Sequence, residues 1–516
     1  MQCPNFTFTV LIIGIIIQQV IADADLVFDS EGYNRGSYGP HPHQYYHSAD
    51  ITSPLLLVNR WDKTKTDNTS YIFLTLDSPV GGGRAGPIIY RADDLTLVYN
   101  DPRWSAAYNA HISQFNGNDY LVFIERSKVG EAISTNCLLY DSMYTLAYNV
   151  SSHGSAHASM EVHECQLTAD GTAIVIVKEI ISSNLTSVGG PEDGKILDNI
   201  IQEIDIETNK LLWIWRASDH YGISESYKEY KDGSGAYDYI HMNSVEKTPE
   251  GDFLISARHT HSIISVDRKS GHINWTLGGK KNNFVDVSAG KATDFAWQHD
   301  ARFGDATLTQ LTMFDNHNTS STTGCTVDCS RGKHVELDYD SRTVRLISEF
   351  YHPESLVSGF EGSYQTMRSG HVFLGWGANP TFTEHLPSGE CVLDVQFDLW
   401  RPDTGYPANY RAFKMDWAAY PTWDPKIAAV RAEQHGHFKV YVSWNGATEV
   451  AKWQLFVGTS YDRVIEYATA VLRTGFETEI LLKSDLPFVR AAALDKAGQI
   501  LGKTAVIQLT DRGGTT

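Results

Sequence analysis

The sequence predicts an all-β protein, and three observations support this prediction. Aromatic residues make up 11% of the 516 residues, with 26 Tyr and 12 Trp, and such side chains favour strands. Short runs of alternating apolar residues recur along the chain after turns rich in Gly, Asn and Asp, which is typical of strand hairpins. The formal net charge is −20, so the surface repels phosphate backbones and we expect no nucleic-acid partner.

The pattern of the N-terminal residues indicates the cellular location of the protein. Residues 6–22 form an apolar run that is short for a membrane span and is followed at once by Asp23 and Asp25. We therefore expect residues 1–22 to be a cleaved signal peptide, residues 23–44 to be an N-terminal extension, and the mature chain to lie outside the membrane. The alternative is a retained signal-anchor, because no Lys or Arg precedes the run. The expected location is secreted or the lumen of the secretory pathway.

Glycosylation motifs and cysteines agree with that location. Acceptor motifs of the form Asn-x-Ser/Thr occur beyond the leader at Asn68, Asn149, Asn184, Asn274 and Asn318. In an oxidising compartment, we expect one disulfide between Cys137 and Cys165 and a second between Cys325 and Cys329, with Cys391 left over.

A repeat defines the larger domain. A turn followed by a β-rich run recurs at 69–77, 117–125, 170–179, 250–258, 304–315 and 369–377. A second strand with an Asp-containing turn follows most copies, at 90–99, 141–148, 205–215, 266–277 and 337–350. Six copies, about 45–70 residues apart, are typical of a six-bladed β-propeller, which we place at residues 45–424. The alternative is two stacked sandwiches.

The pattern changes after Pro421 and Pro425. Strand-like runs are closely spaced from residue 438 to residue 509, which is typical of a small immunoglobulin-like or fibronectin-like β-sandwich. We place this domain at residues 425–516 and expect it to pack against the propeller.

Four histidines precede the turn glycine of four successive repeats, at distances of five to ten residues: His111, His163, His241 and His299. The strand before this turn would be the innermost strand of its blade, so we expect the four imidazoles to meet in one axial pocket. Imidazole can act as a nucleophile or a base near neutral pH. Arg258 and Arg302 lie nearby in sequence and could hold an anionic group, although an ordinary ion pair is an equal alternative for each.

Other histidines form weaker patterns. His41, His43 and His47 could bind a metal but fit a Pro-flanked loop better. His259 and His261 alternate, as if along one strand, without an evident third ligand. We therefore expect no metal and no cofactor. Lys178 is interpreted as a solvated or channel-rim charge at a strand end.

Several segments resemble the arylsulfotransferase-like family, in the branch found mainly in filamentous fungi. The resemblance covers most of residues 45–400 and is carried by His241-Met-Asn-Ser, by 252–280 and by 295–303, with 78–99 and 370–380 fitting the first and last blades. It implies a six-bladed propeller enzyme that moves a sulfuryl group from an aryl sulfate to a phenol through a transiently sulfated histidine, without a nucleotide donor.

The resemblance also implies residue roles. It makes His241 and His299 the catalytic residues, and we expect Asn243, His111, His163, Arg258 and Arg302 to bind the substrate. The chain departs from the family pattern at 361–371, where the innermost strand of the last blade offers Glu361, Tyr364 and Gln365 in place of a histidine.

Three function classes follow. The first is an arylsulfotransferase-like enzyme that acts on a small aromatic molecule. The second keeps the pocket but uses His, Glu and Tyr as acid and base, as a cyclase or isomerase of a secondary-metabolite pathway would. The third is a non-catalytic propeller that binds a partner. The oligomeric state stays open.

Overall fold

The computed structural model describes residues 23–77, 86–104, 106–129, 132–155, 157–233, 235–400, 408–509 and 514–515. The predicted signal peptide, residues 1–22, lies outside these residues. The described chain is built from β-strands, with one short helix, α1 (Ser30–Asn34), and three 3-10 turns, η1 (Thr186–Val188), η2 (Ala217–Asp219) and η3 (Ile223–Glu225). The all-β prediction is confirmed.

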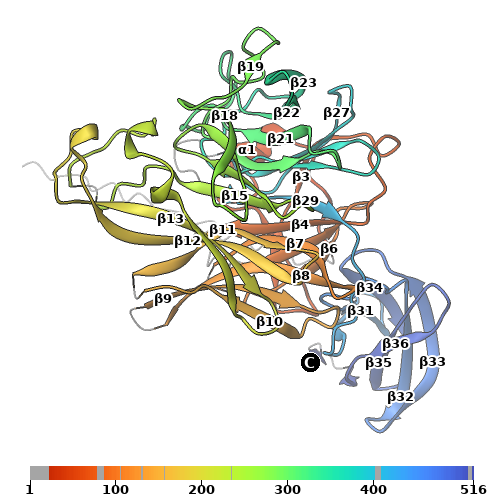
Figure 1. Ribbon diagram of the computed structural model, residues 1–516. Coiled ribbons are helices and arrows are strands. Elements are labelled where there is room, and N and C mark those ends of the chain that lie inside the picture. The colour runs from red at the N-terminus through yellow and green to blue at the C-terminus, as the bar shows by residue number, and fades with distance from the viewer. Residues whose placement is uncertain are drawn as a thin grey trace, which may run out of the picture.

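Three sheets form the first half of the larger body (Figure 1), after a small hairpin of β1 (His43–Tyr45) and β2 (Thr52–Pro54). The first sheet contains β4 (Tyr71–Asp77), β5 (Pro87–Arg91) and β6 (Leu97–Asn100). The second contains β7 (Ala107–Phe115), β8 (Asn118–Val129), β9 (Ala132–Tyr140) and β10 (Leu146–Ser151). The third contains β11 (Ala158–Leu167), β12 (Thr172–Ser183), β13 (Gly194–Asp205) and β14 (Leu211–Arg216).

Three more sheets follow in the same order. The fourth contains β15 (Met242–Lys247), β16 (Phe253–Ala257), β17 (Ser262–Val266) and β18 (Ile273–Gly278). The fifth contains β20 (His299–Phe303), β21 (Gln310–Asp315), β22 (Arg331–Asp338) and β23 (Thr343–Tyr351), with the short β19 (Val285–Asp286) parallel to β23. The sixth contains β24 (Ser363–Thr366), β25 (Val372–Gly375), β26 (Thr381–His385) and β27 (Cys391–Gln396).

Strands from the beginning and the end of this larger body complete its sixth and first sheets. β3 (Leu57–Trp61) adds an outer strand to the sixth sheet by pairing with β27. β28 (Ala408–Asn409) and β29 (Phe413–Met415) pair with β4 and extend the first sheet on its other side. The first strands of neighbouring sheets contact one another from β7 to β24, and β29 contacts both β7 and β25. These contacts join the first strands in a continuous series from β7 to β24, and β29 links β7 to the sixth sheet.

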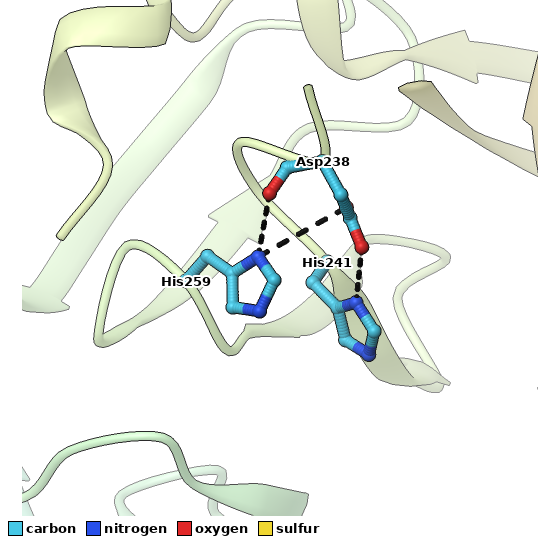
Figure 2. Close-up of side chains that lie close together, drawn as sticks. All are labelled: Asp238, His241 and His259. Carbon is cyan, nitrogen blue, oxygen red and sulfur yellow. Dashed lines mark hydrogen bonds and ion pairs between the residues drawn. The ribbon is translucent and has the colours of Figure 1, made fainter. Parts of the chain in front are cut away.

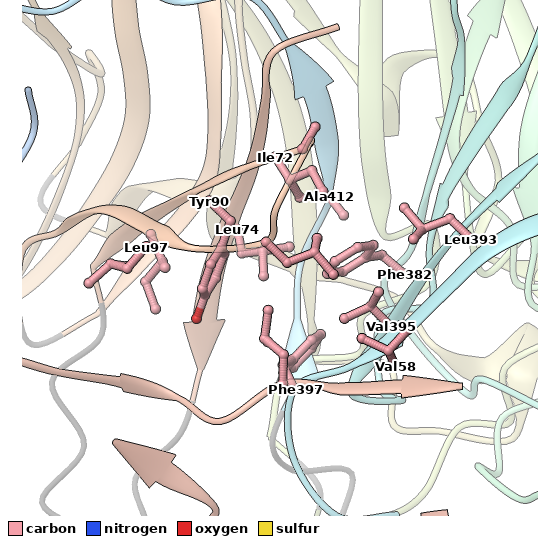
Figure 3. Close-up of a cluster of buried hydrophobic side chains, with 14 of the residues drawn as sticks. Val58, Ile72, Leu74, Tyr90, Leu97, Phe382, Leu393, Val395, Phe397 and Ala412 are labelled. Atoms are coloured by element: carbon pink, nitrogen blue, oxygen red, sulfur yellow. The ribbon is translucent and has the colours of Figure 1, made fainter. Parts of the chain in front are cut away.

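A buried apolar cluster lies where the first and sixth sheets meet. It includes Ile72, Leu74, Phe382, Leu393 and Val395, each at most 1% exposed. Figure 3 shows these side chains facing one another from the two sheets. The closure thus rests on apolar packing as well as on strand pairing.

Two further sheets form the C-terminal part. One contains β30 (Lys426–Arg431), β31 (His437–Ser443), β34 (Glu477–Lys483) and β38 (Gly514–Thr515). The other contains β32 (Lys452–Ser460), β33 (Arg463–Leu472), β35 (Phe488–Leu494), β36 (Ile500–Lys503) and β37 (Ile507–Gln508). Side chains from both sheets share one buried cluster around Trp453 and Val440.

The C-terminal part is hydrogen-bonded to the first two sheets. The backbone N–H of Gly446 donates to the Val98 carbonyl at 2.7 Å, and Tyr144 Oη donates to the Gly446 carbonyl at 3.0 Å. Gly446 has φ of 92°, and a Cβ there would lie 2.6 Å from the Tyr144 ring, so glycine is required at this contact. The connecting residues Trp417 and Ala419 are buried, so this connection is a packed segment.

Both predicted disulfides are confirmed. Cys137 in β9 is bonded to Cys165 in β11, which links the second and third sheets, and Cys325 is bonded to Cys329. Cys391 is free and buried. Disulfides are typical of proteins from oxidising compartments. Among the described residues, no helix is long and apolar enough to cross a membrane.

Candidate active site

A bulge in β11 supplies the first charged groups of the site. The pairing of β11 with β12 stops at Met160, opposite Val177, and resumes at Cys165, opposite Val175. Residues 161–164 therefore face a single residue of β12, and a bulge of this kind redirects side chains. Glu161 and His163 come from this bulge, with the His163 Nδ1 3.0 Å from a Glu161 carboxylate oxygen.

A second carboxylate–histidine pair comes from the segment that enters β15. The Nδ1 of His241 lies 2.5 Å from a carboxylate oxygen of Asp238 (Figure 2). His241 has φ of 52°, in the left-handed region that side chains other than glycine seldom adopt. This strained backbone turns the imidazole back onto the carboxylate three residues earlier, and such strain is often found at functional sites.

The Asp238 carboxylate fixes the tautomer of His241. An ionised carboxylate only accepts hydrogen bonds, so Nδ1 carries the proton and Nε2 keeps its lone pair. Among the described residues, Nε2 of His241 has no hydrogen-bond partner, and the side chain is 20% exposed. A carboxylate-oriented imidazole with an open Nε2 has the arrangement that a base or a nucleophile requires.

The two pairs lie side by side. The rings of His163 and His241 meet edge to face with centroids 4.9 Å apart, and Tyr410 packs against His163 at 5.6 Å. Lys178 in β12 is 8% exposed and lies 3.4 Å from Glu161 and 3.8 Å from Asp238. The interpretation of Lys178 as a solvated or rim charge is wrong, because its ammonium is buried between these carboxylates.

His259 completes the cluster but has both ring nitrogens engaged. Its Nδ1 donates to the Asp238 carbonyl at 2.6 Å, and its Nε2 accepts from Arg258 at 2.9 Å. Its ring centroid is 4.6 Å from that of His241. His259 and His261 do not lie along one strand as expected: they belong to the turn between β16 and β17, and His261 stacks on Tyr227.

Arg258 is a cation without a carboxylate partner among the described residues. Its guanidinium donates to His259 and to the Gly359 carbonyl and lies over the Trp297 ring at 5.2 Å. Its Nε is buried without a hydrogen-bond partner. Burial lowers the pKa of Arg258 to about 10, which leaves it charged at neutral pH. A partly buried guanidinium with no carboxylate in ion-pair contact, next to neutral imidazoles, is suited to bind an anion.

His299 is buried and hydrogen-bonded on both sides of its ring. Its Nδ1 donates to Asn316 Oδ1 at 2.7 Å, and its Nε2 accepts the backbone N–H of Glu361 at 3.2 Å. The Asn316 amide nitrogen donates to the carbonyls of Ser358 and Glu361, which fixes the orientation of Asn316. His299 is therefore held as a neutral imidazole whose lone pair is occupied.

Burial keeps the four imidazoles of the cluster neutral. It lowers the pKa of His241 well below 6.5, with further lowering by Lys178, His163 and Arg258. Burial likewise lowers the pKa of His163 and His299, and it lowers that of His259 to about 2 with help from His241. Burial alone would raise the pKa of Glu161, but Lys178 and His163 outweigh it and hold the value at about 2. Ionised carboxylates thus orient unprotonated imidazoles.

His111 and Arg302 line a different cavity, of about 500 Å³. The histidines of the cluster are not among its lining residues. Arg302 is fully paired: it donates to Glu164 at 2.5 Å and to the Val245 carbonyl at 3.0 Å, and it lies 3.0 Å from Asp300. It therefore has no free charge for an anion.

Asn243 lies between the cluster and this cavity. It is 0% exposed, and its Nδ2 donates to the Gln298 carbonyl at 2.7 Å. Its own carbonyl accepts from Arg411 at 2.9 Å, on the cavity side, and from Tyr410 at 3.3 Å, on the side of the cluster. Asn243 is therefore part of a buried hydrogen-bond network that lies between the histidine cluster and the cavity.

The residues predicted from the sequence thus fall into two groups, one in the histidine cluster and one at a separate cavity. His163 and His241 are in ring contact, Arg258 and His299 are their neighbours, and His111 and Arg302 lie apart. The sequence analysis did not select Asp238, Glu161 or His259 as partners of these histidines. The spacings Asp238-x-x-His241 and Glu161-x-His163 were the available local signals, whereas the contact between the His163 and His241 rings joins two different sheets.

Asp238, His241 and His259 are close enough to hold a metal ion. The donor set does not fit one well, because Nδ1 of His259 is a proton donor and two cations, Lys178 and Arg258, flank the group. His41, His43 and His47 do not converge on one point: His41 pairs with Asp398, His43 contacts Tyr45, and His47 stacks on Tyr441.

Taken together, the geometry defines an all-β protein with a buried, paired-histidine site beside an uncompensated arginine. The arylsulfotransferase (ASST) family model matches residues 132–398, just over half of the 516 residues, and the chain belongs to this family. The matched segment contains both carboxylate–histidine pairs, Lys178, Arg258 and His299.

No curated protein matches the sequence significantly. Among solved structures, a protein of unknown function from Bacteroides caccae is 10% identical, covering 67% of this chain and 98% of its own with a TM-score of 0.39. The β-propeller domain of Cps50 (Swd1) from Myceliophteria thermophila is 10% identical, covering 64% and 92% with a TM-score of 0.28. Virginiamycin B lyase from Staphylococcus aureus is 11% identical, covering 80% and 94% with a TM-score of 0.27. These scores are too low to carry an argument.

Proposed function

We propose that this chain is a secreted arylsulfotransferase-like enzyme that moves a sulfuryl group from an aryl sulfate to a phenol, with His241 as the reactive imidazole. The observation that carries the proposal is the Asp238-oriented, open Nε2 of His241 in the same cluster as Arg258, which has no carboxylate partner. The first group suits attack on an electrophile and the second suits an anionic substrate.

The proposed fold is a six-bladed β-propeller followed by a C-terminal β-sandwich. The six sheets between Leu57 and Met415 would be the blades, and their first strands would surround the central channel. The boundaries of this assignment are those expected from the sequence, residues 45–424 and 425–516.

The reaction proceeds in two steps. In the first, His241 Nε2 attacks sulfur, an N–S bond forms, the S–O bond to the aryl group breaks, and a phenolate leaves and takes a proton from water. In the second, the oxygen of the acceptor phenol attacks sulfur, the N–S bond breaks, and His163 accepts the phenol proton before passing it to solvent. Arg258 holds the sulfuryl oxygens throughout, and Tyr410 and Trp297 offer aromatic faces to the substrate.

The test is turnover of a chromogenic aryl sulfate with a phenol acceptor. His241→Gln is expected to lower kcat by at least on the order of 10³, because the attacking atom is lost. His371→Gln is the matched control, since His371 also pairs with a carboxylate, Glu384 at 2.7 Å, away from the cluster. Equal turnover in wild type and His241→Gln would contradict the proposal.

A second candidate uses the same site for acid–base chemistry, as in a cyclase or isomerase of a secondary-metabolite pathway. It is favoured by the sixth sheet, whose first strand, β24, carries no histidine. In this case His241 would remove a proton from an aromatic substrate, and no aryl sulfate would be consumed. Dependence on His241 without phenol release separates this candidate from sulfuryl transfer.

A further inference from the structure

Lys178 is placed between two carboxylates that come from different parts of the chain. Glu161 belongs to the bulge of β11, and Asp238 belongs to the segment before β15. The ammonium lies 3.4 Å from the first and 3.8 Å from the second, and the side chain is 8% exposed. Within the described residues, no other lysine or arginine is paired with either carboxylate.

Each of these carboxylates also lies against the Nδ1 of one imidazole: Glu161 is 3.0 Å from His163, and Asp238 is hydrogen-bonded to His241 at 2.5 Å. The order across the site is therefore His163, Glu161, Lys178, Asp238, His241, and the two imidazole rings meet again at 4.9 Å. We propose that Lys178 is a positioning residue that locks both carboxylate–histidine pairs in register and keeps both imidazoles unprotonated for the reaction.

A comparison within the chain separates this role from ordinary ion pairing. Lys247 has a similar setting, with 7% exposure and two carboxylates, Glu203 at 2.7 Å and Asp170 at 2.6 Å. Among the described residues, neither of these carboxylates pairs with a histidine. A buried lysine between two carboxylates occurs at both places, and only at Lys178 does each carboxylate orient an imidazole.

The charges that face the two imidazoles determine what Lys178 does. His241 faces Asp238, Glu161, Lys178, Arg258, His163 and His259. His163 faces Glu161, Asp238, Lys178, His241 and Tyr410. The two carboxylates favour a protonated imidazole, whereas the lysine opposes it. Removal of the lysine charge leaves two buried carboxylates facing two histidines, and a proton on one of the rings then becomes favourable.

The consequence for the reaction rests on the proposed function of His241. A protonated His241 has no lone pair on Nε2 and cannot attack. Lys178→Met is therefore expected to lower kcat at the acidic end of the pH–rate profile, with a smaller change in KM. Activity should recover toward pH 9, because the acidic limb of the pH–rate profile moves to higher pH. Lys178→Arg keeps the charge and is expected to retain the wild-type profile.

The direct test does not depend on turnover. In protein labelled with ¹³C at histidine Cε1, the resonances of His163 and His241 are assigned with His163→Gln and His241→Gln and titrated from pH 4 to pH 9. We expect Lys178→Met to raise the pKa of both imidazoles by at least one pH unit, and Lys247→Met to leave both unchanged. Lys178→Gln serves as a second charge-removing variant if Lys178→Met does not fold.

The outcomes separate this inference from the proposed function. Unchanged titration of both histidines in folded Lys178→Met or Lys178→Gln overturns the role of Lys178, whatever the enzyme turns over. An equal shift in Lys247→Met also overturns it, because the effect would then be unspecific. Wild-type turnover in His241→Gln, together with the predicted titration shift, overturns the proposed function and leaves the placement of Lys178 intact.

Discussion

At the scale of single residues, the site is an arrangement of charge around neutral imidazoles. Four histidines, His163, His241, His259 and His299, have pKa values lowered by burial. Oxygen atoms accept from Nδ1 of His241, His259 and His299, and Nδ1 of His163 lies 3.0 Å from the Glu161 carboxylate. The difference lies at Nε2: it accepts from a neighbour in His259 and His299, and, among the described residues, it has no hydrogen-bond partner in His163 and His241. Of the latter two, His241 is the more exposed, at 20% against 11%, and its Nδ1 is hydrogen-bonded to Asp238. These differences are the basis for proposing His241 as the reactive imidazole.

Asp238→Asn tests how that imidazole is held. Asparagine keeps the size of the side chain but removes the charge that favours the Nδ1–H tautomer, so Nε2 carries the proton for part of the time. We expect kcat to fall on the order of 10²–10³, with the melting temperature changed little. The measurement is steady-state turnover with Asp93→Asn as a control, because Asp93 pairs with Arg91 in the first sheet. Unchanged kcat in Asp238→Asn would show that Asp238 does not orient His241.

Arg258→Gln tests the anion site. A hydrogen bond to a charged group contributes about 1.5–3 kcal/mol, so kcat/KM for an aryl sulfate is expected to fall by about 10–100-fold. Arg268→Gln is the control, since Arg268 pairs with Glu203 outside the cluster. If Arg258→Gln binds and turns over the sulfate ester like wild type, the anion must be held elsewhere.

At the scale of elements, most strands follow from the sequence, and the closing strands do not. The repeats expected at 117–125 and 170–179 correspond to β8 (Asn118–Val129) and β12 (Thr172–Ser183), because apolar alternation and turn residues are local signals. β3 pairs with β27 and β29 pairs with β4 across more than 300 residues of chain. No local pattern encodes such a pairing.

The residues of the site, like the closing strands, could be predicted only in part from local sequence patterns. The glycine-based alignment selected His163 and His241, which do meet, but it also selected His111, which lines another cavity. The reason is that inner strands carry irregular residues: four in the bulge at 161–164, and left-handed backbone at Asn109, His241 and Asp300. Each irregularity changes which way the next side chain points, so counting from the turn loses the register.

Phe382→Ala tests the apolar closure between the first and sixth sheets. Phe382 is fully buried in their shared cluster, so its removal leaves a cavity and is expected to cost about 3–5 kcal/mol. Chemical unfolding measures this change in the free energy of unfolding. Leu481→Ala, at a position 54% exposed, is expected to change it by less than about 0.5 kcal/mol, and similar losses in both variants would count against the closure.

At the scale of the whole molecule, buried neutral histidines link stability to pH. The folded-state pKa is lowered for the four clustered histidines, and it is about 4 for His261 and His385. Between those values and 6.5, the unfolded chain binds protons that the folded protein does not. Stability is therefore fully present above pH 6.5 and falls as the pH falls, by up to about 1.4 kcal/mol per pH unit for each such histidine.

We expect the denaturant midpoint to fall from pH 7 to pH 5, because several histidines with lowered pKa values act together. Two groups oppose this trend: His317, whose pKa is raised by Asp315, and Asp23, whose pKa is raised to about 7 by burial. His385→Gln should make the dependence shallower, because it removes one such group that lies outside the cluster. A midpoint that is constant or rises toward pH 5 would show that the buried histidines are not held neutral.

The central claim is that His241 carries the sulfuryl group during transfer, and one measurement tests it most directly. The protein is incubated with an aryl sulfate in the absence of an acceptor phenol, quenched under alkaline conditions and digested. Its peptides are then analysed by tandem mass spectrometry. The account predicts a sulfuryl adduct on the imidazole of His241, lost when a phenol is added and absent from His241→Gln. An adduct on His299 or His163 with His241 unmodified, or phenol release in wild type with no histidine adduct, would contradict it.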